Sequence, residues 1–175
     1  MKLKIVEYPD RKLKEKSKEV VEFDEKLHDL LDSMYPMMME SNGIGLAAIQ
    51  VAHAKRVLIL NIPDEEGVQH DENLLEIINP VIKSSSGETV YQEGCLSVPQ
   101  FYEDIKRHDK IEISYQDRFG VKHDMVADGL LAIAIQHEID HLEGILFIDK
   151  LSYIKRKKFE KEYKRLQKER KHKKA

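Results

Sequence analysis

Cysteine is nearly absent from this sequence, and long hydrophobic runs are missing altogether. The 175 residues include one cysteine, Cys95, so the chain cannot form an internal disulfide. A lone thiol is typical of proteins in a reducing compartment, and we expect a cytoplasmic location. No apolar run approaches the ~18 residues that span a membrane. The polar start of the sequence, Met1-Lys2-Leu3-Lys4-Ile5-Val6, does not resemble a secretory signal, so no membrane partner is expected.

Internal repeats and low-complexity linkers are also missing, which favours a single folded unit large enough to bury a core.

Charge is uneven along the chain, because residues 155–174 carry 12 Lys and Arg against 3 Asp and Glu, a net charge of +9. The rest of the chain has 17 basic and 29 acidic residues, a net charge of −12. We predict one main domain over residues 1–153 and a basic C-terminal helix or tail over residues 154–175. Apolar residues recur at helical spacing there, so the first half of this helix should pack on the domain and its end should be free or disordered.

The order of predicted elements indicates an α+β fold. Asp24 is a suitable N-cap for a helix that runs to about Ser41, in which Pro36 should cause a kink or a break. A second helix is expected over residues 129–142. Strands are expected near residues 57–62, 74–84, 88–92, 110–117 and 121–126, the last two joined by a turn at residues 117–120. The predicted fold is therefore a set of antiparallel strands surrounding a central helix, with a further helix at the C-terminus.

The motif that carries chemistry lies in the second predicted helix, where residues 137–141 read HEIDH. Two histidines four residues apart lie on one face of a helix, with Cβ atoms about 5–6 Å apart, and can bind one divalent metal ion. The glutamate between them is placed to act on a water at that ion. Residues 130–135 are apolar and indicate a buried helix, where imidazoles and a carboxylate need partners. The motif therefore predicts a metal-binding helix with an open coordination position.

Three routes could supply the third protein ligand. A third histidine six residues after His141 is excluded, because Phe147 stands there. Glu160, on a later helix, has the spacing of a zinc endopeptidase ligand but lies in a lysine-rich stretch typical of a solvated surface. Cys95, 42 residues before His137, offers a thiolate, which binds borderline-soft metals strongly. Cys95 is favoured, and Glu160 remains the alternative.

Three segments resemble the motifs of the peptide deformylase family. Residues 43–50 read GIGLAAIQ, residues 93–97 read EGCLS, and residues 136–141 read QHEIDH. The resemblance extends from about Lys4 to about Ser152 and implies that the main domain removes the formyl group from the N-terminal methionine of nascent polypeptides. It also implies that Cys95, His137 and His141 hold one divalent metal ion. That ion is natively Fe²⁺ in this family, and Zn²⁺, Ni²⁺ or Co²⁺ can replace it.

The same resemblance implies roles for residues around the metal. Glu138 would be the general acid and base, while the side chain of Gln50 and the backbone N–H of Leu96 would stabilise the oxyanion. Substrate contacts are expected at Ile44, Gly45, Tyr91, Glu93, Gly94, Leu130, Ile133 and Ala134. The first two would bind an extended peptide through their backbone groups. Tyr91, Leu130, Ile133 and Ala134 would line a slot for the methionine side chain.

Two further residues are expected near this site in supporting roles. Glu93, two residues from the thiolate, would be repelled by it unless paired, and we predict Arg107 as its partner. Asp140 should face away from the ligand side of the helix and serve the structure.

The basic C-terminal segment has two interpretations. In a generic protein it would be a solubilising tail, but in this family it favours a contact with ribosomal RNA near the exit tunnel. No feature indicates DNA as a partner. Two other functions stay open, namely a zinc endopeptidase that uses Glu160, and a catalytically silent module that binds the ribosome or RNA. Glu138 and Gln50 argue against the silent module, because a purely structural metal site needs neither residue.

Overall fold

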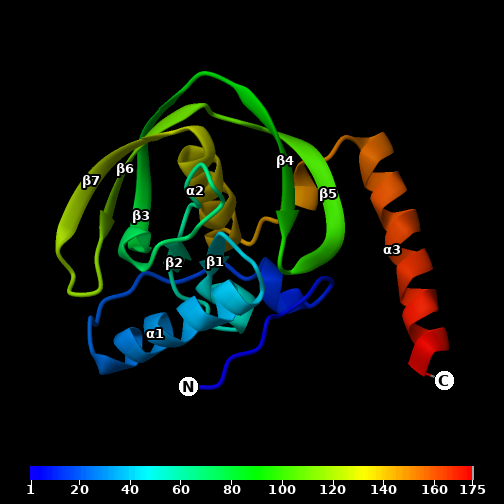
Figure 1. The fold of residues 1–175 in the computed structure, drawn as a ribbon, viewed down its shortest axis with the longest axis horizontal. Coiled ribbons are helices and arrows are strands. Elements are labelled where there is room, and N and C mark those ends of the chain that lie inside the picture. The colour runs from blue at the N-terminus through cyan, green and yellow to red at the C-terminus, as the bar shows by residue number, and fades with distance from the viewer. Residues whose placement is uncertain (175) are drawn as a thin grey trace.

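The computed structural model describes residues 1–174, so Ala175, the last residue of the predicted basic segment, lies outside the described residues. A helix, α2 (Gly129–Leu142), lies at the centre between two antiparallel sheets (Figure 1). The larger sheet has the strand order β1 (Gly45–Ala47), β2 (Val57–Leu60), β3 (Leu75–Ser86), β6 (Lys110–Gln116) and β7 (Lys122–Asp128). The smaller sheet pairs β4 (Thr89–Cys95) with β5 (Val98–Arg107). The predicted α+β class is confirmed.

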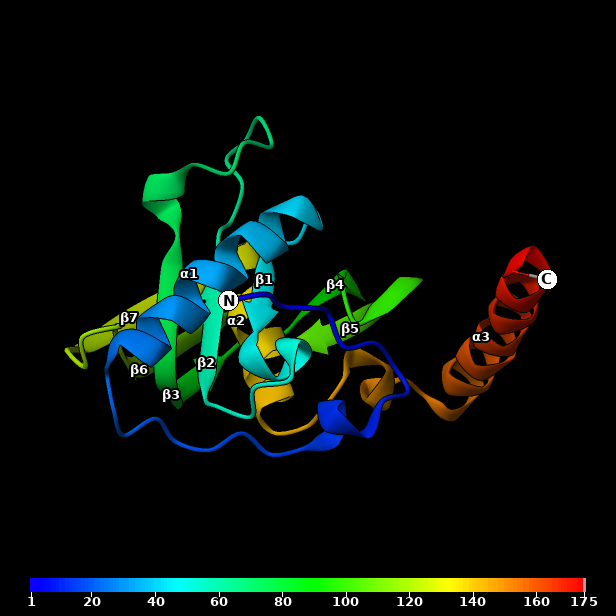
Figure 2. The same cartoon turned by 90° about the horizontal axis from the view of Figure 1, so that it is seen from below.

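The five-stranded sheet is covered by a helix on each face, which explains the continuous apolar run of β2. Val57 and Ile59 pack in one core cluster with the buried residues of α1 (Glu25–Glu40). Leu58 and Leu60 pack in a second cluster with α2. Because alternate residues of a strand face opposite sides, a strand covered on both faces has no polar position. Figure 2 shows α1 crossing the sheet on the side away from α2.

Helix α1 begins where the sequence predicts, because the side chain of Asp24 accepts a hydrogen bond from the backbone N–H of Leu27 at 3.1 Å. Of the kink or break predicted at Pro36, the break does not occur, since α1 is continuous from Glu25 to Glu40. Pro36 lies on the exposed face of the helix, where water can satisfy the carbonyl that loses its partner. The opposite face buries five side chains, and this packing outweighs one missing hydrogen bond.

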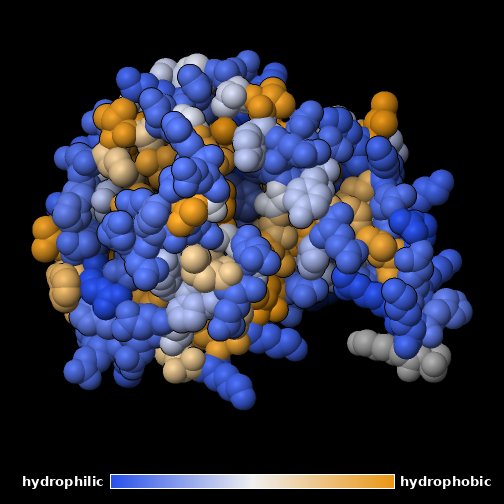
Figure 3. Space-filling view, viewed as in Figure 1, coloured by the Kyte–Doolittle hydropathy of each residue, from blue (hydrophilic) through white to orange (hydrophobic). Residues whose placement is uncertain are grey.

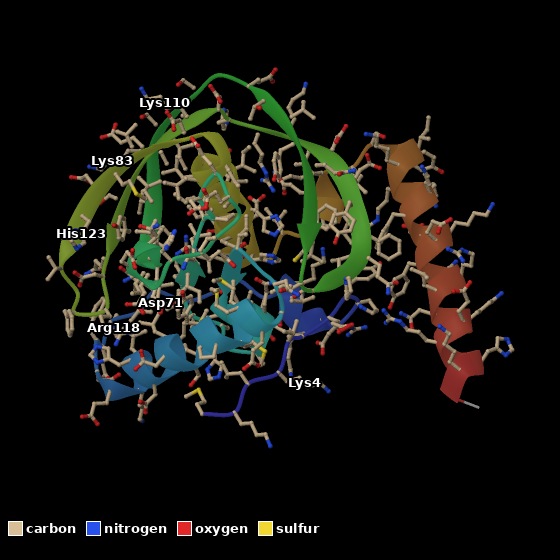
Figure 4. All side chains as sticks on the ribbon, in the orientation of Figure 1. Lys4, Asp71, Lys83, Lys110, Arg118 and His123 are labelled. Atoms are coloured by element: carbon tan, nitrogen blue, oxygen red, sulfur yellow. The ribbon has the colours of Figure 1, made fainter. Side chains whose placement is uncertain are left out.

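The predicted turn at residues 117–120 is confirmed. The backbone N–H of Asp117 donates to the carbonyl of Val121 at 2.9 Å, and Gly120 has a φ of +81°. Arg118 in this turn reaches Asp32 of α1 and Glu76 of β3, both at 2.7 Å, and so ties the hairpin to α1 (Figure 4).

Strands β1 and β5 were not predicted. β1 has three residues, which is too short for a periodic signal. β5 carries a bulge, because its register with β4 passes from Glu93–Glu103 to Cys95–Val98, so residues 99–102 face a single residue of β4. Gln100 within the bulge has a φ of +72°. A bulge of this length interrupts the alternation by which a strand is recognised.

The C-terminal helix α3 (Tyr153–Lys174) leaves the body of the protein at a large angle (Figures 1 and 2). Its first half packs as predicted, through Phe159 and Tyr163 against Tyr8 and Phe101. Of the two predicted states of its end, free or disordered, the described residues show the first, because the helix continues to Lys174 and residues 168–173 are exposed. Arg–Glu pairs at helical spacing around Arg165 support this second half.

Three short 3-10 helices complete the core: η1 (Arg11–Lys14), η2 (Ala48–Val51) and η4 (Phe147–Lys150). A fourth, η3 (Asp71–Asn73), lies in the loop before β3.

Candidate metal centre and active site

Helix α2 places two histidines on one buried face. His137 and His141 are 8% and 1% exposed, and their Nε2 atoms lie 3.3 Å apart. The helix ends directly after them in a Schellman motif, in which Gly144 and Ile145 donate backbone hydrogen bonds to the carbonyls of His141 and Asp140. Gly144 has a φ of +76°, which glycine adopts without strain. The sequence therefore fixes both the spacing of the two rings and the end of the helix that carries them.

Cys95 reaches the same point from the end of β4. Its Sγ lies 3.4 Å from Nε2 of His141, and the three potential ligand atoms of Cys95, His137 and His141 all lie within 4.8 Å of one another. A tetrahedral ion with bond lengths of about 2.05 Å to nitrogen and 2.3 Å to sulfur would separate two nitrogens by about 3.3 Å, and nitrogen from sulfur by about 3.6 Å. The observed separations of 3.3 and 3.4 Å fit one metal ion.

The charge around the two rings also fits a cation. Burial opposes the charged form of His137, but its neighbours Glu138, Cys95 and Glu93 outweigh burial and raise the pKa of the ring well above its usual range. Burial lowers the pKa of His141, which leaves that ring neutral with a free lone pair. Anionic neighbours around a neutral imidazole and a thiol are the surroundings in which a divalent ion is stable.

A buried carboxylate orients His137 from behind. Oε1 of Glu93 lies 2.8 Å from Nδ1 of His137, which leaves Nε2 directed at the candidate metal position. Arg107 binds both oxygens of Glu93, at 2.7 and 2.8 Å, and also pairs with Asp140. Burial raises the pKa of Glu93, but the hydrogen bonds from Arg107 and His137 outweigh it and lower the pKa to about 2. The predicted Glu93–Arg107 pair is confirmed, and the carboxylate of Glu93 is fully engaged by protein groups.

Glu138 lies beside the ligands without a partner for one oxygen. Its Oε1 is buried and has no hydrogen bond within the described residues, and burial raises the pKa of the carboxyl to about 7. A Cβ at Gly45 would lie 2.8 Å from Oε2 of Glu138, so only glycine lets β1 approach this closely. An unpartnered buried carboxyl is costly unless a ligand or substrate engages it.

Gln50, in η2, directs its amide N–H₂ toward the thiol. The backbone N–H of Ala47 donates to Oε1 of Gln50 at 2.9 Å, which orients the amide. Nε2 of Gln50 then lies 3.1 Å from Oγ of Ser97 and 3.5 Å from Sγ of Cys95. Gln50 is therefore a neutral donor held at the edge of the candidate metal position.

The N-terminal segment holds this region from outside. The N–H of Val6 donates to the carbonyl of Gln50 at 2.7 Å, and the N–H of Tyr8 donates to the carbonyl of Ser97 at 2.8 Å. The backbones of Gln50 and Ser97, the two residues whose side chains meet beside the thiol, are thus held by Val6 and Tyr8.

A cavity of about 530 Å³ opens above these groups and is visible as the hollow near the centre of Figure 3. Every residue that the sequence predicts for catalysis or substrate binding lines it: Ile44, Gly45, Gln50, Tyr91, Glu93, Gly94, Leu96, Leu130, Ile133, Ala134 and Glu138. Of the three predicted metal ligands, Cys95 and His137 line the cavity, while His141 is almost fully buried beneath it. The structure therefore gathers all the predicted residues at one site.

Sequence reasoning missed three groups at this site. Ser97 lies within the EGCLS motif, so its position next to the thiol was an available signal. The bulge residues Gln100 and Phe101 also line the cavity, but a bulge has no sequence signature. Gln69 donates to the carbonyls of Gly43 and Asn61, at 3.0 and 2.8 Å, and steadies the loop before β1. That contact joins residues far apart in the sequence and had no signal.

Glu160, the alternative third ligand, lies elsewhere. It pairs with Arg156 and Lys157 along α3, and the metal-binding group found among residues 1–174 consists of Cys95, His137 and His141. Phe147, at the position where a third histidine would stand, packs its buried ring near that of His137. Among the described residues, no helix has both the length and the apolar character that crossing a bilayer requires.

Comparisons with known proteins agree over nearly the whole chain. A family model described as Polypeptide deformylase matches residues 2–157. The peptide deformylase of Wolinella succinogenes is 60% identical over 165 residues, which are 94% of this chain and 97% of that protein. A peptide deformylase crystal structure from Legionella pneumophila has a TM-score of 0.85 at 40% identity and covers 94% of this chain and 96% of that one. The peptide deformylase of Ehrlichia chaffeensis in complex with actinonin has a TM-score of 0.84 at 39% identity, covering 93% and 96%.

Proposed function

The chain belongs to the polypeptide deformylase family, and we propose that Cys95, His137 and His141 are the ligands of its catalytic metal ion. As a member of this family, the protein is a metal-dependent hydrolase that removes the formyl group from nascent polypeptides. The observation that carries the proposal is the convergence of one sulfur and two nitrogens within 4.8 Å of one another, beside the carboxyl of Glu138, one oxygen of which has no partner among the described residues. These two features together are what hydrolysis of an amide requires.

The donor set suits Fe²⁺, which we propose as the native ion, and Zn²⁺, Ni²⁺ or Co²⁺ can occupy the same ligands. One thiolate and two neutral imidazoles leave a divalent ion with one net positive charge. When bound, such an ion supplies a Lewis acid that polarises an oxygen and lowers the pKa of water.

Glu138 carries the proton in the proposed reaction. A water oxygen forms a bond to the formyl carbon, and Glu138 accepts the proton that this water releases. The bond between the formyl carbon and the amide nitrogen then breaks, and Glu138 delivers the proton to that nitrogen. Formate and a free methionine amine leave. A carboxyl with a pKa of about 7 accepts and returns a proton at neutral pH with little bias either way.

Two neutral donors face the oxygen that becomes negative. Gln50, whose amide nitrogen lies 3.5 Å from Sγ of Cys95, and Leu96, which follows Cys95 in the chain, both line the cavity. Because Ala47 and Ser97 already hold the amide of Gln50, it needs little reorganisation when the charge develops. We propose these two groups as the oxyanion donors.

Substrate orientation follows from the edge of the larger sheet. β1 is an edge strand, so the side away from β2 is free to pair with an extended peptide at Ile44 and Gly45. Leu130, Ile133 and Ala134 of α2, with Tyr91 across the cavity, provide the apolar slot for methionine. Glu93 and Gly94 also line the cavity.

A metal and activity assay tests the site. Protein purified without oxygen should contain one metal ion per chain and release formate from a formyl-Met tripeptide, and actinonin should inhibit it. Cys95→Ala should lose both metal and activity, whereas Glu160→Ala should keep both. Retention of metal by Cys95→Ala, or its loss from Glu160→Ala, would contradict the proposed ligand set.

We further propose that the protein acts in the cytoplasm at the ribosome. The division proposed is a catalytic domain over residues 1–153 and a basic helix over residues 154–175, which would bind ribosomal RNA near the tunnel exit. The support is the net charge of +9 over residues 155–174 and the projection of α3 away from the domain.

Co-sedimentation with ribosomes at 50 and 200 mM salt tests the ribosome contact. Wild type should bind strongly only at the lower salt concentration, and K164E/K168E/K171E should not bind at either. Equal binding of both proteins would contradict the role of the helix. Formate release from a tripeptide by the triple variant should stay at the wild-type rate, since these lysines do not line the cavity.

A further inference from the structure

A second hollow lies between β5 and α3, next to the substrate cavity. Its volume is about 390 Å³, and its floor is formed by apolar side chains of β5, η4 and α3. Figure 3 shows hydrophobic surface between the body and α3, on the same face as the central hollow. None of the steps proposed for deformylation uses this second hollow.

The two hollows share a wall. Gln100, Phe101 and Tyr102 line both of them. These residues belong to the bulge in β5. In this bulge, four residues of β5 (99–102) lie opposite one residue of β4, Gly94. A Cβ at Gly94 would lie 2.5 Å from the ring of Tyr102, so the ring lies directly on this glycine. The wall between the hollows is therefore a single bulged strand segment, and Tyr102 on it is 66% exposed.

The length of the substrate suggests what occupies the second hollow. A nascent polypeptide is long, and only its first residue enters the reaction, so the chain that follows must leave the cavity over its rim. We propose that the hollow between β5 and α3 is a docking groove for the nascent polypeptide downstream of its first three residues. This inference rests on the proposed function of the neighbouring site and extends it to the rest of the same substrate.

The charges around the groove favour a polypeptide over RNA. Lys155 is neutralised by Glu103 at 3.0 Å, and Arg165 by Glu162 at 3.0 Å. Lys158 is the one groove-lining cation without an ion pair among the residues that the structure describes. RNA binding needs several unpaired cations along a surface, whereas a nearly neutral groove with an apolar floor suits the side chains of an unfolded chain.

A comparison of two substrates measures the effect of the groove. A formyl-Met tripeptide reaches only the cavity, whereas an octapeptide with Leu and Phe at positions 5–8 extends about 17 Å further. Wild type should show a kcat/KM about five- to tenfold higher for the octapeptide, mainly through KM, because a few apolar side chains become buried. L151Q/L166Q should lose most of this gain and retain the wild-type rate on the tripeptide.

A matched control and a second measurement complete the test. Ile154→Gln makes the same aliphatic-to-amide change on α3 at a residue that is 80% exposed and does not line the groove, and it should keep the full length dependence. An octapeptide with a photoreactive residue at position 6 should cross-link to residues of β5 or the first half of α3.

Four results would overturn the groove assignment. One is a wild-type enzyme whose kcat/KM is the same for both substrates, and another is a length dependence that survives in L151Q/L166Q. A third is a cross-link elsewhere on the protein. The fourth is loss of ribosome binding by L151Q/L166Q with its length dependence intact, which would assign the groove to RNA. If the wild-type protein releases formate from neither substrate, the proposed function is refuted, and the groove assignment with it.

Discussion

At the scale of single residues, the site separates the groups that hold a metal from the group that moves a proton. Cys95, His137 and His141 converge within bonding range of one point, while Glu138 keeps one oxygen without a partner. The two functions can therefore be removed independently by substitution.

Substituting the proton carrier tests this separation. Glu138→Ala should lower kcat about 10²–10⁴-fold, because the proton no longer has a positioned acceptor. The metal content should stay at the wild-type value, since the three ligands are untouched. Formate release and elemental analysis measure the two quantities, with Glu160→Ala as the control that should change neither. Loss of metal from Glu138→Ala would mean that this carboxyl is itself a ligand.

Sequence reasoning was most successful at this scale where the spacing was short. His137, Glu138 and His141 lie within five residues on one helix, so helical geometry alone places them together. Cys95 could be chosen over Glu160 by its chemistry. Contacts such as Ser97 with Gln50, or Gln69 with Gly43, join distant residues through loops, and no periodic pattern in the sequence encodes them.

At the scale of elements, the site depends on how helix α2 ends and on how β4 and β5 are joined to it. Gly144 ends the helix one turn from the buried rings, and a Cβ there would lie within 2.4 Å of the backbone oxygen of Lys14. Arg107 of β5 joins Glu93 of β4 to Asp140 of α2. Both connections predict measurable losses of stability.

Gly144→Ala should lower the free energy of unfolding by about 2–4 kcal/mol, because the left-handed backbone and the clash with Lys14 both oppose a side chain. Gly67→Ala is the matched control, since Gly67 has a φ of +83° but nothing within 4 Å of the added Cβ. It should cost about 1 kcal/mol. Urea denaturation of both variants measures the difference, and equal losses would show that the contact with Lys14 is unimportant.

Arg107→Met should lower the free energy of unfolding by about 3–5 kcal/mol, because it leaves the buried carboxylate of Glu93 without its cation. The side chains of Arg107 and Glu93 are only 3% and 4% exposed. Arg165→Met, which breaks exposed pairs on α3, should leave the free energy of unfolding close to the wild-type value. Urea denaturation measures the free energy of unfolding of both variants. Equal losses would contradict the claim that burial makes the Arg107–Glu93 pair important for stability.

The prediction of elements succeeded where local rules decide the structure and failed where packing does. The N-cap at Asp24, the glycine turn at residues 117–120 and the range of α2 all follow from local chemistry. Pro36 opposes a helix locally, but five buried side chains on the opposite face keep α1 continuous. The bulge in β5 carries Phe101, which packs on Phe159 of α3, a contact over 58 positions that the sequence of β5 does not indicate.

At the scale of the whole molecule, a residue of η4 joins the N-terminal segment of the chain to the start of α3. Asp149 of η4 accepts hydrogen bonds from Lys14 near the N-terminus and from Arg156 of α3. Burial raises the pKa of Asp149, but Lys14, the backbone N–H of Leu146 and Arg156 outweigh it and lower the pKa below 3.8. Asp149 thus joins η1 to the first turn of α3 through one carboxylate.

The stability due to Asp149 should depend on pH. Because its pKa is lower in the folded state, the carboxylate stabilises the fold above the unfolded pKa of 3.8 and loses this effect as pH falls through the folded value. Asp149→Asn should therefore be less stable than wild type by about 1 kcal/mol at pH 7, a value reduced for partial exposure to solvent. Urea denaturation should show the difference shrinking below pH 4. A difference that is independent of pH would assign the effect to packing.

The order in which the site is assembled has a consequence for synthesis of the protein itself. Residues 6 and 8 hold the backbone beside the thiol, Cys95 lies in the middle of the chain, and the last ligand is His141. A ribosome adds residues from the N-terminus onward, so no deformylase activity can arise before position 141 has been translated and has emerged. A new copy therefore cannot deformylate its own chain before His141 has emerged, and only an older copy can act on that chain until then.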